Sequence, residues 1–144
     1  MDTERKALIF NGFGLLASIF ILLSGAIIPQ AIVDMLVQIF GLLLIIWAAI
    51  TIKAHKPKHT LPKGYFFLDK GPYEIIRHPI YAGYLLIMIS IIELDFSFLR
   101  LIALIILTVA IFMKILREEH TMTLEVDEYK EYMKKTKAFI PYLL

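Results

Sequence analysis

Apolar residues fill two long stretches in the first third of the chain. Leu8 to Ile28 is interrupted only by Asn11 among strongly polar residues, and Ile32 to Ile52 follows after the pair Pro29-Gln30. Each stretch has about 20 residues, which is the length of α-helix that crosses a bilayer and exceeds the roughly 7–15 residues of a signal-peptide core. We therefore predict two retained membrane helices, joined as a hairpin with almost no loop.

Two further apolar stretches lie in the second half. Ile80 to Ile92 has 13 residues, which as a helix reach about 20 Å and fall short of the roughly 30 Å hydrocarbon core. After a turn at residues 93–97, Leu99 to Leu116 is long enough to span the membrane. The pattern predicts an all-α integral membrane protein with about four transmembrane helices, the third of which is extended by its flanks or ends inside the bilayer.

Residues 53–77 form a basic, water-facing connector between the second and third apolar stretches. Loops longer than about 12–15 residues are usually functional or disordered. This connector contains the apolar run Tyr65-Phe66-Phe67-Leu68, so we expect it to pack against another part of the molecule.

The chain becomes charged again after Arg117. Residues 125–135 carry a broken stripe of apolar side chains among acids and lysines. This pattern predicts an amphipathic helix at the membrane surface, which could also close a pocket.

Composition supports one membrane domain covering residues 1–144. Hydrophobic residues make up 59% of the chain, against about 45–50% in soluble domains. The chain has no cysteine, which excludes disulfides, thiol catalysis and thiolate metal sites. The net charge of +2 gives no reason to expect a nucleic-acid partner.

The basic residues lie at one end of the predicted helices. Two precede the first helix, six lie in the connector and six follow from Lys114 onward, whereas only Arg100 falls on the other side. The positive-inside rule then places both termini and the connector in the cytoplasm. The high content of isoleucine and lysine, with no eukaryotic targeting signal, favours a prokaryotic inner membrane.

The first polar cluster is the segment 71–83, which leads into the third helix. Arg77 and Tyr81 are four residues apart and would share a helix face, and Pro79 suits a first helical turn. Polar groups at a membrane edge are costly and often functional. The alternative is a membrane anchor, with the arginine on lipid phosphate and the tyrosines in an interfacial belt.

The second polar cluster ends the fourth apolar stretch. Lys114 and Glu118 are four residues apart, and Glu119 follows. One interpretation is an ordinary surface ion pair with a solvated neighbour. The other is that Glu118 accepts hydrogen bonds from a polar ligand while Lys114 faces an anion.

No metal site is predicted from the four histidines. His55 and His59 have helical spacing, but Pro57 between them argues against a regular helix. His78 and His120 lie in different parts of the chain, so the sequence offers no compact set of ligands.

An ordered set of motifs connects these clusters. The motifs are Gly71-x-Tyr73, Arg77-His78-Pro79-x-Tyr81-x-Gly83, Glu118-Glu119, Glu128-Tyr129-x-x-Tyr132 and Ile140-Pro141. Together they resemble the integral membrane methyltransferases typified by isoprenylcysteine carboxyl methyltransferase, to which phospholipid N-methyltransferases are related. The resemblance runs from about Lys56 to Pro141, and residues 1–52 match only in type.

The resemblance implies that residues 53–144 bind S-adenosyl-L-methionine on the cytoplasmic side. The implied cofactor-binding residues are Tyr65, Phe66, Phe67, Leu68, Tyr73, His78, Pro79, Ile80, Tyr81 and Glu118. We expect Lys114 and Arg77 to be catalytic, and Lys114 and Glu119 to bind substrate. Lys114 stands where the isoprenylcysteine enzymes have an arginine, which changes the grip on an anionic acceptor because lysine has no bidentate fork.

The methyl acceptor is expected to be a lipid or a lipidated small molecule. A carboxylate needs a cation to hold it, and Lys114 would serve, whereas an amine needs a base such as His78 or Glu119. We favour the carboxylate. A phospholipid amine is the alternative, and Tyr73 and Tyr81 are candidates to face the sulfonium.

Other functions and partners stay open at this stage. A non-catalytic membrane adaptor would keep the same pattern for packing, and a nicotinamide-dependent reductase would need a phosphate-binding glycine loop that is not visible. Membrane lipids are expected partners, and the glycines of the first helix could support an oligomer.

Overall fold

The computed structural model describes residues 3–61 and 64–139, so Lys63 and the Ile140-Pro141 motif lie outside the described residues. The membrane-type helices are α1 (Thr3–Leu23), α2 (Ile32–Ala54), α3 (Pro79–Leu94) and α4 (Phe98–Glu125). The remaining elements are β1 (His59–Thr60), β2 (Phe66–Phe67), the 3-10 helix η1 (Gly71–Glu74) and α5 (Asp127–Lys135).

The predicted all-α membrane fold is confirmed. The segments Glu4–Leu23, Ile32–Ala54 and Phe98–Glu125 are long and apolar enough to cross a membrane. With 16 residues, α3 is longer than the predicted third stretch but still reaches only about 24 Å. The fourth helix continues past the predicted end at Leu116 as far as Glu125, so Glu118 and Glu119 lie on a helix and no loop follows them directly.

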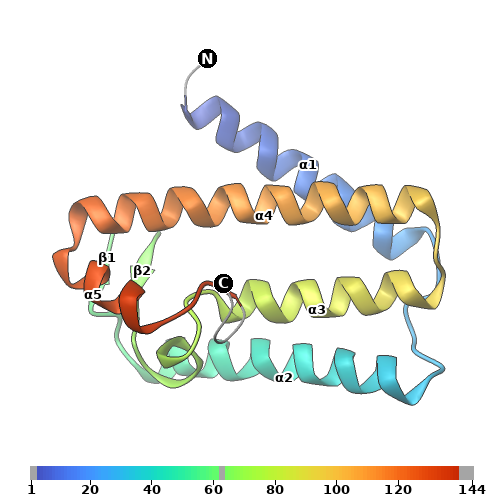
Figure 1. Ribbon diagram of the computed structural model, residues 1–144, viewed down its shortest axis with the longest axis horizontal. Helices are drawn as coiled ribbons and strands as arrows, with labels where there is room; N and C mark the ends of the chain where they lie inside the picture. The colour runs from blue at the N-terminus through green and yellow to red at the C-terminus, as the bar shows by residue number, and fades with distance from the viewer. Residues whose placement is uncertain (1–2, 62–63, 140–144) are drawn as a thin grey trace.

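The helices pair differently from the predicted tight hairpin. Figure 1 shows α3 between α2 and α4, with α1 crossing α4 and diverging from it toward the N-terminus. The main helix pairs are α2 with α3 and α1 with α4. A non-helical link at residues 24–31 separates α1 from α2, which gives each of these helices room to find its partner in the second half of the chain.

Small residues set the α2–α3 pairing. A Cβ built at Gly41 would lie 2.7 Å from the Gly83 carbonyl oxygen, and one built at Gly83 would lie 2.5 Å from the Gly41 carbonyl oxygen. The two backbones are therefore in direct contact, which is how small residues promote helix association where lipid removes the hydrophobic drive. On the other side of the bundle, α1 comes close to α4 at Gly14, where a Cβ would lie 3.0 Å from the Ala110 Cβ.

A buried arginine joins three helices at the end of the bundle opposite the connector. Arg100 is 1% exposed. Its Nη2 donates to the carbonyls of Ile21 (3.3 Å) and Ile91 (3.1 Å), and its Nη1 donates to the Asp95 carbonyl. These carbonyls lie in or just after the last turns of α1 and α3, where intrahelical donors are missing. Arg100 therefore satisfies helix ends that lipid could not, which offsets the cost of its burial.

The described parts of the connector close the other end of the bundle. Strands β1 and β2 pair antiparallel, with His59 opposite Phe67 and Thr60 opposite Phe66. Phe67 and Leu68 are buried, which confirms that this apolar run packs against the rest of the molecule. Gly71 has a positive φ of 58° and lies so close to Thr51 of α2 that a Cβ would approach its Oγ1 to 2.6 Å. The chain can therefore turn tightly onto α2.

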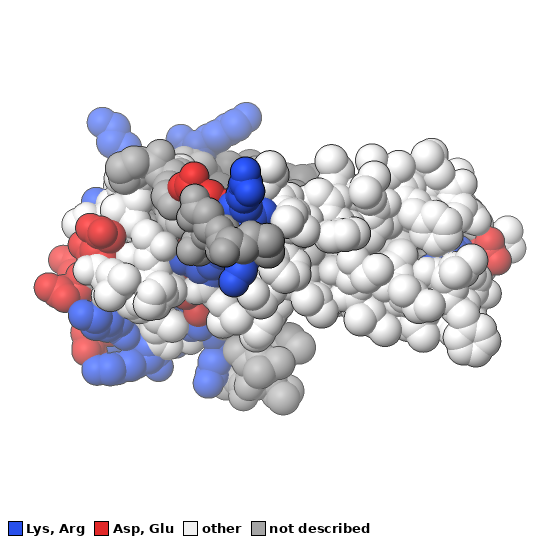
Figure 2. Space-filling model, turned by 90° about the horizontal axis from the view of Figure 1, so that it is seen from above, with Lys and Arg blue, Asp and Glu red and all other residues white. Residues whose placement is uncertain are grey.

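Charged side chains gather at this connector end, around α5. In Figure 2 they crowd one end of the visible face, whereas the other end is almost free of them. This arrangement follows the charge asymmetry of the sequence. The side of the membrane on which this end lies stays a prediction.

We predict that Gly83→Ala destabilises the bundle by about 1–3 kcal/mol, because the added methyl forces α2 and α3 apart. Thermal unfolding of the detergent-purified protein, followed by circular dichroism, would measure the change. Gly12→Ala is the matched control, since a Cβ at Gly12 meets nothing within 4 Å. Equal midpoints for the two variants would contradict the close packing of α2 on α3.

Candidate active site

A cavity of about 120 Å³ lies at the connector end, between the connector, α3, α4 and α5. It draws its walls from three regions of the sequence, which are residues 66–81, Glu118 of α4 and the tyrosines of α5. The lining residues are Phe66, Phe67, Leu68, Tyr73, Arg77, His78, Pro79, Ile80, Tyr81, Glu118, Tyr129 and Tyr132.

The cavity brings together most of the residues expected to bind the cofactor. Every one of them lines it except Tyr65, which lines a separate hollow between α1 and α4. Tyr129 and Tyr132 also line it, although we did not expect them as site residues. The motif Tyr129-x-x-Tyr132 and the apolar stripe of this segment were the available signals, but they did not show which way the stripe would face.

Aromatic rings make up one side of the cavity. The Phe67 ring lies 4.9 Å from the Tyr132 ring and 5.5 Å from the Tyr129 ring, centroid to centroid. Phe66 meets the edge of Tyr73 at 6.0 Å. These contacts fasten β2 to η1 and α5, so the aromatic wall depends on the packing of three separate segments.

Three of the tyrosines that line the cavity are neutral hydrogen-bonding groups. Burial raises the pKa of Tyr73, Tyr129 and Tyr132 well above the usual value for a phenol. The Tyr132 hydroxyl donates a 2.6 Å hydrogen bond to the Tyr73 carbonyl. With their protons held, these phenols can orient a ligand but are poorly suited to remove a proton from one.

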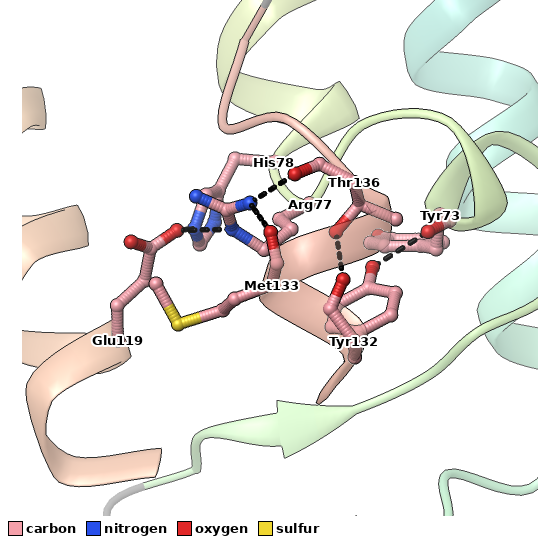
Figure 3. Close-up of polar contacts among 7 residues, drawn as sticks. All are labelled: Tyr73, Arg77, His78, Glu119, Tyr132, Met133 and Thr136. Atoms are coloured by element: carbon pink, nitrogen blue, oxygen red, sulfur yellow. Dashed lines mark hydrogen bonds and ion pairs between the residues drawn. The ribbon is translucent and has the colours of Figure 1, made fainter. Parts of the chain in front are cut away.

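An ion cluster adjoins the cavity, and two of its members, Arg77 and His78, also line it. Glu119 Oε1 accepts from Arg77 Nε at 2.6 Å and from His78 Nε2 at 3.1 Å. Arg77 Nη1 also donates to the carbonyls of Thr136 (2.6 Å) and Met133 (3.4 Å), as Figure 3 shows. The cluster therefore connects the start of α3, α4 and the end of α5.

The interpretation that Arg77 and Tyr81 share a helix face is wrong. The helix begins at Pro79, and Arg77 lies in a bend before it. Proline fits the first helical turn but disfavours helical conformation in the residue before it. The Arg77 side chain is thus free to reach Glu119, while Tyr81 stacks on His78 with ring centroids 6.0 Å apart.

The two neighbouring glutamates have different surroundings. Glu119 is buried in the ion cluster and does not line the cavity, so its predicted substrate contact has no direct support in the geometry. Glu118 lines the cavity and has no hydrogen bond or ion pair with any other residue in the described part of the chain. Its carboxylate is left for a ligand.

Lys114 does not form the expected ion pair with Glu118. Its Nζ lies 5.3 Å from the centroid of the Tyr81 ring, a cation–π contact at the edge of the cavity. Lys114 itself is not a lining residue, but Tyr81 is. Within residues 3–61 and 64–139, no group of three or more His, Asp or Glu side chains is placed to hold a metal.

The family of the chain follows from a comparison with known protein families. Residues 19–124 match the model of the isoprenylcysteine carboxyl methyltransferase family. This chain belongs to that family. No curated protein and no solved structure matches it. Membership makes the protein a membrane methyltransferase, and the matched region of this family member covers every cavity-lining residue except those of α5.

We predict that Glu119→Gln lowers the free energy of unfolding of this methyltransferase by about 2 kcal/mol, because it removes the charge that accepts from Arg77 and His78. Thermal unfolding in detergent would measure it. Glu118→Gln is the matched control on the adjacent residue, and it should leave stability unchanged or slightly higher, since no cation loses its partner. A larger loss for Glu118→Gln would contradict this division of roles.

Proposed function

We propose that this protein transfers a methyl group from S-adenosyl-L-methionine to a carboxylate on a lipid-like acceptor, at the cytoplasmic face of the membrane. The observation that carries the proposal is the convergence of aromatic faces and the unpartnered Glu118 carboxylate in one cavity. That cavity lies at the charged end of a membrane bundle whose family is a methyltransferase family.

The side chains fit this cofactor by chemistry. Aromatic faces such as Tyr73 and Tyr81 attract a sulfonium. Glu118 can accept charge-assisted hydrogen bonds from an ammonium group or bonds from ribose hydroxyls. When bound, S-adenosyl-L-methionine supplies an electrophilic methyl group on a positively charged sulfur. We assign Tyr73, Tyr81 and Glu118 to hold it, with Phe66, Phe67 and Leu68 as apolar support.

The cavity is smaller than a pocket that encloses a ligand the size of this cofactor. Pockets for ligands of this class measure about 300–1,000 Å³, whereas this cavity measures about 120 Å³. It can hold part of the cofactor in its present form. For the cavity to enclose the whole molecule, one wall has to move outward.

We propose that Lys114 holds the anionic acceptor. Its ammonium lies over the ring of Tyr81, which lines the cavity, and from there it would orient a carboxylate toward the methyl donor. Orientation of two reactants is the main contribution a protein makes to such a displacement. A carboxylate already carries its negative charge, so this acceptor needs no base.

The arrangement of possible bases favours a carboxylate over an amine. An amine acceptor must lose a proton, and we considered His78 and Glu119 for that role. These two side chains are hydrogen-bonded to each other, and Glu119 is also bonded to Arg77. The phenols nearby are held in their protonated form by burial. His78 and Glu119 are therefore committed to structure, and Glu118, the carboxylate without a partner among the described residues, is assigned to the cofactor.

The acceptor is proposed to reach the site from the membrane. Among the helices that line the cavity, α4 exposes large apolar side chains between Phe98 and Leu124, which lipid would cover. A lipid-like substrate can then approach between helices while the soluble cofactor arrives from the cytoplasm. Membrane lipids and a second copy of the chain are the other partners we propose.

We predict saturable binding of S-adenosyl-L-methionine and S-adenosylhomocysteine, but not of NADPH, to the detergent-purified protein in calorimetric titration. Glu118→Gln should weaken this binding at least about tenfold, equivalent to about 1.4 kcal/mol, because it removes the ligand's charged partner. Glu125→Gln alters an exposed carboxylate on the same helix and is the control. No binding by folded wild-type protein would reject the cofactor and favour a non-catalytic adaptor.

We predict that Lys114→Ala lowers kcat/KM for a carboxylate acceptor about 100-fold, a loss of about 2.7 kcal/mol, with unchanged affinity for S-adenosylhomocysteine. Suitable probes are an S-prenylated N-acetylcysteine, a fatty acid and phosphatidylethanolamine in mixed micelles. Lys114→Arg should keep most activity. Lys130→Ala, which alters an exposed lysine of α5, is the control and should leave kcat/KM unchanged. Turnover of the amine lipid alone, insensitive to Lys114, would replace the carboxylate assignment with N-methylation.

A further inference from the structure

The cavity wall contributed by α5 differs from the other walls in how it is attached. The walls from α3 and α4 belong to long helices packed in the bundle, and the β2 wall is paired with β1. The wall from α5 is a helix of nine residues that follows Val126, a residue with extended backbone angles (φ −133°, ψ 103°). A single non-helical residue between α4 and α5 is a natural hinge.

The outer face of α5 has few polar contacts with the rest of the molecule. Its ion pairs, Lys130 with Asp127 and Lys134 with Glu131, lie within the helix itself. The contact of Glu128 with His59 of β1 is exposed and 4.0 Å long. Exposed pairs of this kind contribute about 0–1 kcal/mol, so this face does little to hold α5 in place.

The inner face and the C-terminal end of α5 carry the attachments. Tyr129 and Tyr132 pack on Phe67, and the Tyr132 hydroxyl bonds to η1. The strongest polar attachment is Arg77, whose guanidinium reaches the carbonyls of Met133 and Thr136. These carbonyls lie at the end of α5, where intrahelical donors are missing and the helix dipole favours a cation.

Arg77 is itself held from the opposite side. Glu119 on α4 accepts from Nε, and the Arg77 side chain is only 9% exposed. The backbone around Arg77 also pairs with the segment after α5, through Arg77 N to Lys137 O at 2.7 Å and His78 N to Ala138 O at 3.2 Å. Arg77 is therefore the side chain through which α4 and the end of α5 are joined, as Figure 3 shows.

We propose that Arg77 is a positioning residue that latches α5 over the cavity, and that α5 is the wall that swings outward to admit the methyl donor. The part concerning the donor rests on the proposed function, whereas the latch does not. Glu119 fixes the guanidinium, Arg77 holds the last turn of α5, and the helix places Tyr129 and Tyr132 against the ligand. Opening breaks the two bonds from Nη1 and the bond from the Tyr132 hydroxyl to the Tyr73 carbonyl, and it separates Tyr129 and Tyr132 from Phe67. The helices α1 to α4 keep their packing.

This proposal replaces the expected catalytic role of Arg77. Its Nε and Nη1 are both bonded to protein, so although Arg77 lines the cavity, most of its guanidinium is engaged in joining α4 to the end of α5. Loss of Arg77 should therefore change how fast ligand enters and leaves more than it changes the chemical step.

Hydrogen exchange of the ligand-free protein tests the latch directly. In Arg77→Lys, which keeps the charge but loses the fork, amides of residues 127–138 should exchange at least about tenfold faster, equivalent to about 1.4 kcal/mol. Amides of α1 to α4 should be unchanged. Arg77→Ala should show a larger effect in the same segment, and Lys134→Ala, which breaks only an exposed pair, should show none. Unchanged exchange in α5, or faster exchange throughout, would overturn the latch.

Stopped-flow binding of S-adenosylhomocysteine tests the role of α5 as a gate. Arg77→Lys should raise the dissociation rate constant at least about tenfold, equivalent to about 1.4 kcal/mol if association were unchanged. The association rate constant should also rise or stay the same. A wild-type dissociation rate in a variant whose α5 exchanges faster would overturn the gate. Failure of wild-type protein to bind the ligand, with the exchange result intact, would reject the cofactor and leave the latch standing.

Discussion

The buried contact between Arg77 and Glu119 is the interaction on which the site depends. It joins a bend before α3 to the last third of α4. Through Arg77 Nη1, which donates to the Thr136 carbonyl, it also reaches the end of α5. A buried ion pair contributes little net stability on its own, but removing one partner leaves a costly unpaired charge. Its effect here is to fix three segments relative to one another. The cavity lies where these segments meet, so its shape follows from this contact.

The other helix contacts hold the cavity end of the bundle in position, although lipid removes the hydrophobic force that would bring the membrane helices together. Gly41 and Gly83 bring α2 and α3 into backbone contact, and Gly14 of α1 packs closely against the Ala110 side chain of α4. At the far end, Arg100 binds the free carbonyls of two helices. Lipid can replace neither close packing nor hydrogen bonds. Arg100 thus joins α4 to the ends of α1 and α3 at one end of the bundle, and Arg77 joins α4 to the end of α5 at the other.

Two adjacent glutamates of α4 have different roles, one in ligand binding and the other in holding the structure together. Glu119 points to the ion cluster, whereas Glu118, one residue earlier, lines the cavity without a protein partner. Successive positions on a helix differ by about 100°, so neighbouring carboxylates face different surroundings. This geometry supports a methyltransferase site in which positively charged groups of the ligand meet Glu118 and aromatic faces, while the anionic acceptor meets Lys114.

The sequence by itself determined the membrane helices, the charge asymmetry and most of the residues around the cavity. Helix spans can be predicted because transfer into lipid depends on the local run of side chains. The ordered motifs were enough to indicate the family. Only the tertiary structure decided that α1 pairs with α4, that Tyr129 and Tyr132 turn inward, that Tyr65 faces a different hollow, and that Lys114 lies over Tyr81 rather than beside Glu118. These outcomes depend on contacts between segments far apart in the chain, and local hydropathy and spacing carry no information about which distant surface a side chain will meet.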